Sequence, residues 1–189
     1  MIQARAGDRT AFENLIIRYE KPLYGYLVRL LRDESAAEDV FQDTWLRVMK
    51  ALDRFDPELR VAPWVYRIAT NLCRDQGRRK KHRAHPSLDQ PVVPGEDGTL
   101  GERIASTDRL PDEVVESAAL GEHVREAVAL LPDRQREAFV LRHYQGLTYE
   151  EIARAQRCSL AAVKSNIHHA VVTLRRRLER LGLSPVTQS

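Results

Sequence analysis

Residues 147–169 read LTYEEIARAQRCSLAAVKSNIHH, and this stretch decides the fold of the C-terminal part of the chain. Thr148 followed by Glu151 matches a capping box, which begins a short helix. Ser159 is a good N-cap for a second, longer helix. A short helix, a tight turn and a longer helix make up a helix-turn-helix, so the spacing predicts this motif.

The second of these helices has two contrasting faces. At 100° per residue an apolar stripe forms on one side. This stripe consists of Val163, Ile167, Ala170, Leu174 and Leu178. The outer face is polar and cationic, as in a recognition helix that enters the major groove. It carries Lys164, Ser165, His168, His169 and Arg176, with Asn166 at its edge. The alternative is a plain helical hairpin with a solvated face, but both caps, the stripe and the basic run 175–177 favour the helix-turn-helix.

Helical spacing of apolar residues recurs along the chain, and no stretch alternates like a strand. The predicted helices are Arg9–Glu20, Lys21–Leu31, Ser35–Leu52, Ala62–Arg79, Asp112–Leu131, Asp133–Tyr144, Thr148–Gln156 and Ser159–Arg180. Pro22 is tolerated near the start of the second helix. Residues 83–111 are rich in proline, glycine and acidic residues and show no periodicity. We therefore expect an all-α chain of two small helical domains, 1–82 and 112–182, joined by a flexible acidic linker.

Charge is distributed unevenly, although the formal net charge is only +3. Residues 74–83 carry six Lys/Arg against one acid, and residues 164–180 carry five against one. Residues 84–116 have a local net charge of −6, from eight acids and two arginines. Two basic patches around an acidic middle suggest two surfaces that contact a polyanion. The alternative is that the charge runs are solvated helix faces.

In the N-terminal part, Ser35 to Glu38 reads as a second capping box, which opens an amphipathic helix. The exposed side of this helix would present Asp39, Gln42, Asp43 and Leu46. A leucine flanked by carboxylates and an amide is a suitable docking face for a basic partner helix. The alternative is an acidic face that is simply solvated.

The helix predicted at 62–79 combines an apolar side with a polar ridge. Arg67, Asn71, Arg74 and Arg78 are three or four residues apart and share this ridge. Such a ridge could grip phosphates and hydrogen-bond an unpaired base. The apolar and aromatic residues of the helix are expected in the core.

Several function classes are disfavoured by what the sequence lacks. Cys73 and Cys158 are far apart and have no partners at metal-ligand spacing, which favours a reduced protein. The histidines and acids form no metal or triad spacing, and there is no glycine-rich phosphate loop. No apolar run approaches the roughly 20 residues of a membrane span, and no signal peptide is recognisable. We therefore expect a soluble cytoplasmic protein that does not insert into a membrane, with no cofactor, no metal site, no catalytic residues and no enzymatic activity.

Taken together, these segments resemble the extracytoplasmic-function (ECF, group four) sigma factors of the sigma-70 family, in order and over nearly the whole chain. The matching segments are Ala11–Leu15, Ala37–Leu46, Pro63–Asn71 with Asp75 and Arg78-Arg79, Leu131–Glu137, Leu147–Ala153 and Val163–Ser165. The resemblance implies a promoter-recognition subunit that initiates transcription. Its partners would be core RNA polymerase, promoter DNA and an anti-sigma factor that holds it inactive.

The resemblance also implies roles for individual residues. Residues 1–82 would be region 2, and residues 112–182 region 4. The clamp helices of the large polymerase subunit would bind Asp39, Gln42, Asp43 and Leu46. The minus-ten element would contact Arg67, Thr70, Asn71, Arg74, Arg78, Arg79, Lys80 and Lys81. The minus-thirty-five element would contact Thr148, Tyr149, Lys164, Ser165, Asn166, His168, His169 and Arg176.

The recognition helix departs from the family pattern. Asn166, His169 and Val171 stand where the pattern has arginine, and Ala161 and Ala162 replace Gly and Thr. Fewer cations on this helix predict a smaller phosphate contribution to binding. Two alternatives therefore stay open: a sigma-like decoy that titrates an anti-sigma factor, and a helix-turn-helix regulator that is not a sigma factor.

Overall fold

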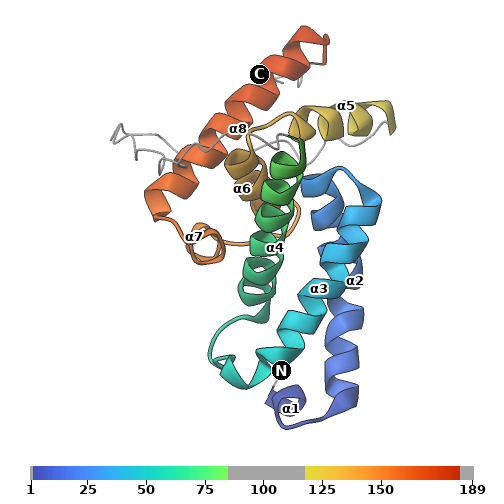
Figure 1. Ribbon diagram of the computed structural model, residues 1–189. Helices are drawn as coiled ribbons and strands as arrows, with labels where there is room; N and C mark the ends of the chain where they lie inside the picture. The colour runs from blue at the N-terminus through green and yellow to red at the C-terminus, as the bar shows by residue number, and fades with distance from the viewer. Residues whose placement is uncertain (1, 85–117, 184–189) are drawn as a thin grey trace.

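A computed structural model describes residues 2–84 and 118–183, and every regular element in these two ranges is helical (Figure 1). The elements are α1 (Ile2–Arg5), α2 (Arg9–Leu31), α3 (Glu34–Lys50), η1 (Leu52–Arg54), α4 (Val61–Ala84), α5 (Ala118–Ala129), α6 (Asp133–His143), α7 (Tyr149–Gln156) and α8 (Leu160–Arg180). The predicted all-α fold class is confirmed. Residues 85–111 of the predicted linker lie outside the described ranges.

The first lobe is a bundle of α2, α3 and α4, each packed against the other two. Leu23, Tyr26 and Leu27 of α2 meet Val48 of α3 and Val65 of α4 in its core, and all five are fully buried. Burying one such apolar side chain contributes about 1.5–3 kcal/mol. The bundle is therefore held mainly by its apolar faces.

Helix α2 runs unbroken through Pro22, so the prediction of two helices, Arg9–Glu20 and Lys21–Leu31, is wrong. A proline inside a helix removes a hydrogen bond and crowds the preceding turn, at a cost of about 3 kcal/mol. The apolar stripe continues across the proline from Leu15 to Leu30. Its burial outweighs the cost of one proline.

The corner between α2 and α3 uses Asp33 rather than Ser35, so the predicted capping box at Ser35 is wrong. Arg32 takes a left-handed conformation with φ of 54°, which ends α2. The carboxylate of Asp33 then accepts a hydrogen bond from the Ala36 N–H at 3.1 Å. Aspartate is as good an N-cap as serine, and it comes first after the turn.

The second lobe contains the predicted helix-turn-helix in α7 and α8. The Glu151 N–H donates to Thr148 Oγ1 at 3.2 Å and the Thr148 N–H donates to Glu151 Oε2 at 2.9 Å, which confirms the capping box. Ser159 caps α8 by accepting from the Ala162 N–H, as predicted. The whole predicted stripe of α8 is buried, where the helix packs on α5, α6 and α7.

Other helix boundaries differ more modestly from the prediction. Helix α4 continues to Ala84, beyond the predicted end at Arg79, so the whole basic run 78–81 is helical. Helix α5 begins at Ala118, and residues 112–117 of the predicted helix lie outside the described ranges. The short elements α1 and η1 were not predicted.

The two lobes lie against each other, which helical periodicity could not predict. Helix α4 packs along α7, and α2 contacts α5 and α6 (Figure 1). Buried residues of both lobes form one continuous cluster. The long helix α8 lies on the outer side of the second lobe and extends away from α4.

Within the two described ranges, no helix combines the length and the apolar character that crossing a membrane requires. The same residues include no group of three or more His, Cys, Asp or Glu that could hold a metal ion.

We expect Thr148→Ala to destabilise the protein by about 1 kcal/mol, because it removes the acceptor of the capping box. The measurement is urea unfolding followed by circular dichroism. Ser165→Ala is the matched control, since Ser165 is exposed and lies inside α8 rather than at a cap. A loss in the control as large as that of Thr148→Ala would contradict a specific capping effect.

Candidate functional site

Helix α3 presents one continuous exposed face at the surface of the first lobe. Asp39, Gln42, Asp43 and Leu46 all lie on it and are all exposed. Leu46 is 50% exposed, and Met49, one turn further, is 51% exposed. The sequence reasoning missed Met49, although its i+3 spacing from Leu46 was a usable signal. Two carboxylates and an amide beside two apolar side chains make a surface suited to a basic, amphipathic partner.

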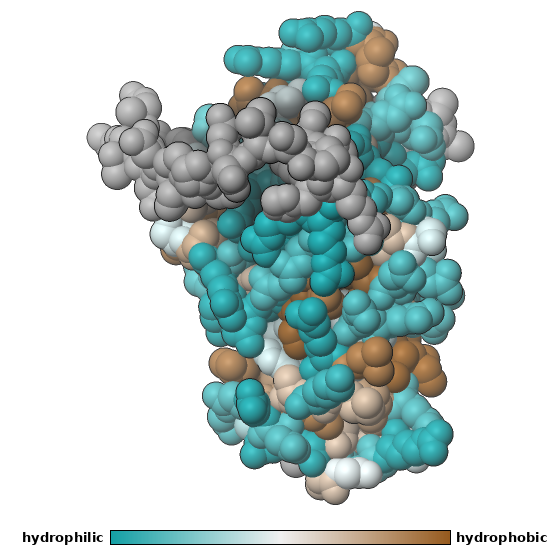
Figure 2. Space-filling view, viewed as in Figure 1, coloured by the Kyte–Doolittle hydropathy of each residue, from teal (hydrophilic) through white to brown (hydrophobic). Residues whose placement is uncertain are grey.

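Aromatic residues behind this face fix its orientation. Trp45 packs edge-on against Phe12 of α2 and against Phe41, with centroid distances of 6.1 and 6.3 Å. Tyr24 of α2 packs edge-on against Phe41. Such pairs contribute about 0.5–1.5 kcal/mol each beyond burial. Figure 2 shows brown apolar patches interrupting the hydrophilic surface over this lobe.

Helix α4 carries the polar ridge predicted from spacing. Arg67 and Asn71 are partly exposed, and the ridge continues into the exposed basic end of the helix. That end contains Arg78, Arg79 and Lys80, while the side chain of Lys81 lies outside the described set. Lys80 Nζ pairs with Asp33 at 2.7 Å, and Arg78 pairs with Asp75. Both pairs are exposed, so they hold their cations only weakly.

Arg74 differs from the rest of the ridge because it points into the second lobe. Its Nε donates to Glu137 Oε1 of α6 at 3.0 Å, and its Nη2 donates to Glu137 Oε2. Burial opposes the charge of Arg74, but the hydrogen bond and charge of Glu137 outweigh it and raise the pKa of Arg74. Arg74 therefore stays charged and paired.

The second lobe presents the polar face of α8 to solvent. Lys164, Ser165, His169 and Arg176 are exposed, and Asn166 and His168 are partly exposed. The rings of His168 and His169 meet edge-on with centroids 5.7 Å apart. This face continues onto the start of α7, where Thr148 is exposed and Tyr149 partly exposed. Here the guanidinium of Arg142 lies 5.1 Å from the Tyr149 ring centroid, a cation that the sequence reasoning missed.

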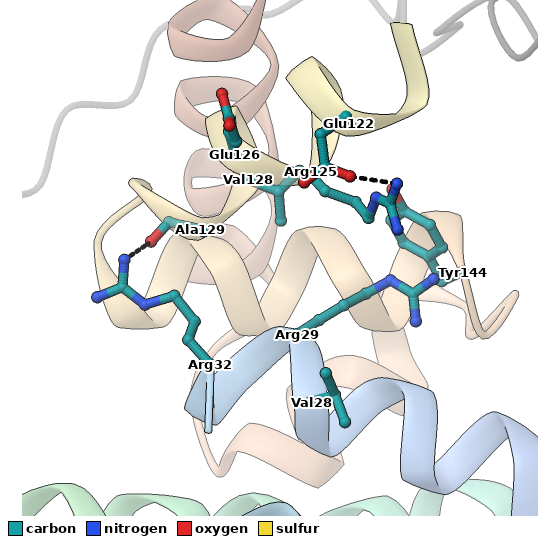
Figure 3. Close-up of a pocket in the computed structure, with 9 residues that line it drawn as sticks. All are labelled: Val28, Arg29, Arg32, Glu122, Arg125, Glu126, Val128, Ala129 and Tyr144. Atoms are coloured by element: carbon teal, nitrogen blue, oxygen red, sulfur yellow. Dashed lines mark hydrogen bonds and ion pairs between the residues drawn. The ribbon is translucent and has the colours of Figure 1, made fainter. Parts of the chain in front are cut away.

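Two clefts lie where the lobes meet. The first, of about 250 Å³, lies between α2 and α5, and Figure 3 shows the cations of α2 and the acids of α5 around it. Arg29 lies over the Tyr144 ring at 4.3 Å there, and Arg32 donates to the Ala129 carbonyl. The second, of about 400 Å³, lies between α4 and α6 and is lined by Cys73, Arg74, Glu137 and further basic residues.

Comparison with known proteins assigns both lobes. The family profile described as Sigma-70 region 2 matches residues 15–83, and the one described as Sigma-70, region 4 matches residues 122–174. The ECF RNA polymerase sigma factor SigW of Bacillus subtilis (strain 168) is 32% identical over 95% of both chains. The chain belongs to the ECF sigma factors of the sigma-70 family. The sigma factor CarQ of Myxococcus xanthus is 31% identical over 97% of this chain and 98% of its own.

Solved structures agree with this assignment. CnrH, in complex with the cytosolic domain of CnrY, is 25% identical and superposes with a TM-score of 0.67, covering 95% of this chain and 94% of its own. RpoE of Bartonella quintana, in complex with the anti-sigma factor NepR, shares the fold with a TM-score of 0.69 at 23% identity, covering 89% of this chain and 97% of its own.

Membership in the family settles the class of function. As an ECF sigma factor the protein initiates transcription and is not an enzyme. A helix-turn-helix regulator of another class is ruled out, because region 2 is present as well as region 4. The decoy alternative is likewise set aside in favour of an initiating sigma factor.

Thr70 was predicted to contact the minus-ten element, but it does not lie on the exposed ridge of α4. Its side chain is fully buried between α2 and α4. Its hydroxyl donates to the Tyr66 carbonyl at 2.7 Å and therefore accepts from the Tyr26 hydroxyl, 2.6 Å away. Burial raises the pKa of Tyr26 well above its ordinary value, so Tyr26 remains a donor.

We expect Thr70→Val to cost about 1–3 kcal/mol, because it leaves the buried Tyr26 hydroxyl without a partner. Tyr26→Phe should cost less, about 0.5–1.5 kcal/mol, because Thr70 keeps its bond to the Tyr66 carbonyl. Thr70→Ser should restore most of the stability. Denaturant unfolding of the three variants tests this order. A neutral Thr70→Val would contradict the structural role.

Proposed function

We propose that the exposed face of α3 docks on the clamp helices of the large subunit of core RNA polymerase. We further propose that the ridge of α4 reads the minus-ten element, that the helix-turn-helix reads the minus-thirty-five element, and that an anti-sigma factor controls the protein. The observation that carries the proposal is the exposure of all three surfaces on the two regions that define a sigma factor.

The α3 face supports a protein partner rather than DNA. Asp39 and Asp43 would repel phosphate, whereas they would attract a basic helix. Leu46 and Met49 offer the desolvated centre that a stable interface needs, and the carboxylates form its polar rim.

The side chains of the α4 ridge are suited to binding single-stranded DNA. Asn71 offers both a donor and an acceptor to a base edge. The exposed cations Arg78, Arg79 and Lys80 offer charge to phosphates without selecting sequence. Arg67 lies one turn before Asn71 and can contribute both to base recognition and to phosphate binding. Thr70 is left out of this set because it is buried.

The helix-turn-helix is suited to binding duplex DNA through a small set of side chains. Lys164 and Ser165 are exposed near the start of α8, where a recognition helix meets base edges. Val171, which stands where the family pattern has arginine, is buried in the core instead. This helix therefore grips the duplex with fewer cations than the pattern provides.

An anti-sigma partner is supported by the solved relatives. RpoE is recorded with the anti-sigma factor NepR, and CnrH with the cytosolic domain of CnrY. We propose a partner of the same class for this chain, acting in the same compartment as the polymerase, the cytoplasm.

Asp43→Arg is expected to weaken binding to core polymerase at least about tenfold, since it places a like charge against a basic partner. The thermal unfolding midpoint should not change, because Asp43 is exposed. Titration of labelled protein with core polymerase measures the affinity. Glu58→Arg, an exposed acid outside the face, is the matched control. Equal affinity of wild type and Asp43→Arg would refute the docking assignment.

Asn71→Ala is expected to change the preferred base at one minus-ten position, by about 1–3 kcal/mol. Arg79→Ala should instead weaken every promoter alike and reduce the salt dependence by about one phosphate contact. Run-off transcription from a promoter library with core polymerase compares the two. Uniform losses for Asn71→Ala would assign that residue to packing. Absence of transcription with the wild-type protein from every promoter would overturn the proposed function as a whole.

A further inference from the structure

The cleft between α4 and α6 is large enough for a small molecule and is strongly cationic. Its volume of about 400 Å³ falls in the usual range of small-molecule sites, about 300–1,000 Å³. Of the described residues that line it, two are acids, Asp133 and Glu137, and six are cations. Six cations less two acids give the lining a formal charge of +4. The cations are Arg32, Arg74, Arg78, Lys80, Arg134 and Arg136.

The neighbouring cleft between α2 and α5 has a much smaller excess of charge (Figure 3). The described residues around it include three arginines and two glutamates, and Arg125 pairs with Glu122. Its lining is therefore close to neutral. A polyanionic ligand is better matched to the cleft between α4 and α6.

Two of the six cations are buried and already neutralised. Arg74 pairs with Glu137, and Arg136 pairs with Asp133. The two arginine side chains are only 20% and 10% exposed. Because these pairs use both acids of the cleft, the excess charge belongs to the other four cations. These four are exposed and form the cationic rim of the cleft: Arg32, Arg78, Lys80 and Arg134.

The two arginines of the cationic rim that lie outside α4 are each bonded to a backbone carbonyl. Arg32 Nη1 donates to the Ala129 oxygen at 3.0 Å, and Arg134 Nη1 donates to the Gln156 oxygen at 3.3 Å. A guanidinium carries five N–H donors, so both side chains have further donors to offer. Their planar forks match the oxygens of a phosphate group.

The two cations that α4 contributes to the rim are paired with carboxylates at the surface. Lys80 pairs with Asp33, and Arg78 pairs with Asp75. Neither acid is among the described residues that line the cleft. Exposed pairs contribute little to stability and are weakened by salt. A multiply charged ligand can therefore replace these carboxylates as the partner of Lys80 and Arg78.

Part of the lining is apolar. This apolar wall consists of Leu30 and Leu31 at the end of α2 and Cys73 of α4. Burial raises the pKa of the Cys73 thiol, so the thiol stays neutral. Inorganic phosphate would leave the apolar wall in contact with water. An organic group that carries phosphates would cover it, which favours binding.

We propose that the cleft binds a nucleoside diphosphate, with its phosphates at the cationic rim and its nucleoside against the apolar wall. A single phosphate group carries a charge of about −1.5 to −2 at neutral pH, which offsets at most about half of the excess charge. A second phosphate brings the charge of the ligand closer to that of the rim. The inference goes beyond the proposed function, because this site involves neither polymerase nor promoter.

The site has one consequence that does rest on the proposed function. Arg78 and Lys80 belong both to the cationic rim and to the end of α4 that is proposed to bind DNA phosphates. A bound nucleoside diphosphate would therefore compete with the minus-ten strand for these two cations. Arg134 lies outside both proposed DNA-binding sets, so its substitution separates nucleotide binding from DNA binding.

The experiment is isothermal titration calorimetry of the full-length protein with adenosine and guanosine diphosphate, in buffer with EDTA at physiological salt. The corresponding monophosphates are the ligand controls. The variants are Arg134→Ala and Arg134→Lys, and Arg154→Ala is the matched control, because Arg154 is an exposed arginine of α7 outside the cleft. Thermal unfolding checks that each variant is folded, which the exposure of Arg134 favours.

We expect at least one of the two diphosphates to bind about tenfold or more tightly than its monophosphate. Arg134→Ala should weaken diphosphate binding about tenfold, which corresponds to the loss of one charge-assisted hydrogen bond. Arg134→Lys should weaken it less, because lysine keeps the charge and loses the fork. Arg154→Ala should bind as the wild type does.

Affinity for fluorescein-labelled single-stranded DNA provides the second readout. Arg134→Ala should leave it unchanged, whereas Arg78→Ala should weaken the binding of both DNA and diphosphate. If Arg134→Ala weakens DNA binding as much as diphosphate binding, the cleft belongs to the DNA path and the nucleotide site is refuted.

Two further results would overturn the site. One is the absence of binding of either diphosphate to the wild type. The other is equal diphosphate affinity in Arg134→Ala and Arg154→Ala, which would show attraction to surface charge without a defined site. Neither result touches the proposed function, because the titration contains no polymerase and no promoter.

Discussion

Helix α4 is packed on two sides at once, and the rest of the structure depends on that constraint. One side supplies Val65, Ala69 and Leu72 to the core of the first lobe. A second side meets α7, with Tyr66 and Arg74 bonded to residues of the second lobe. The ridge of Arg67 and Asn71 and the basic end of the helix remain accessible. The same helix therefore joins the lobes and carries the surface proposed for the minus-ten element.

The parts of the fold that sequence reasoning predicted are those set by neighbouring residues. The capping box of Thr148 and Glu151, the cap at Ser159 and the stripe of α8 each depend on spacing within a few residues. The exposed face of α3 and the ridge of α4 follow from the same helical period. Local chemistry and periodicity are sufficient for these features, and the region 4 motif is the clearest case.

What sequence reasoning missed depends on contacts between distant residues or on competition between neighbours. Pro22 would end the helix if the apolar stripe of α2 on either side of it were exposed. Instead, α3 and α4 bury that stripe. Ser35 is a good N-cap residue, yet the left-handed turn at Arg32 makes Asp33 the first residue that can cap α3. The family resemblance assigns Thr70 to the minus-ten contact, but its hydroxyl is satisfied by Tyr26, 44 residues earlier in the chain. The pair of Arg74 and Glu137 spans 63 residues and has no signature in either local segment.

The two surfaces proposed to bind DNA differ in the number of cations that they present. The tip of α8 offers Lys164 among neutral polar groups, since Asn166 stands where the family pattern has arginine and Val171 is buried. The end of α4 offers Arg78, Arg79 and Lys80, all exposed and held only by surface pairs. Because each neutralised phosphate contributes to affinity, the proposal assigns more of the attraction for DNA to the end of α4 than to the tip of α8. Arg74 of the same helix is paired with Glu137 of the second lobe, so its charge is not available to that surface while the lobes are packed together.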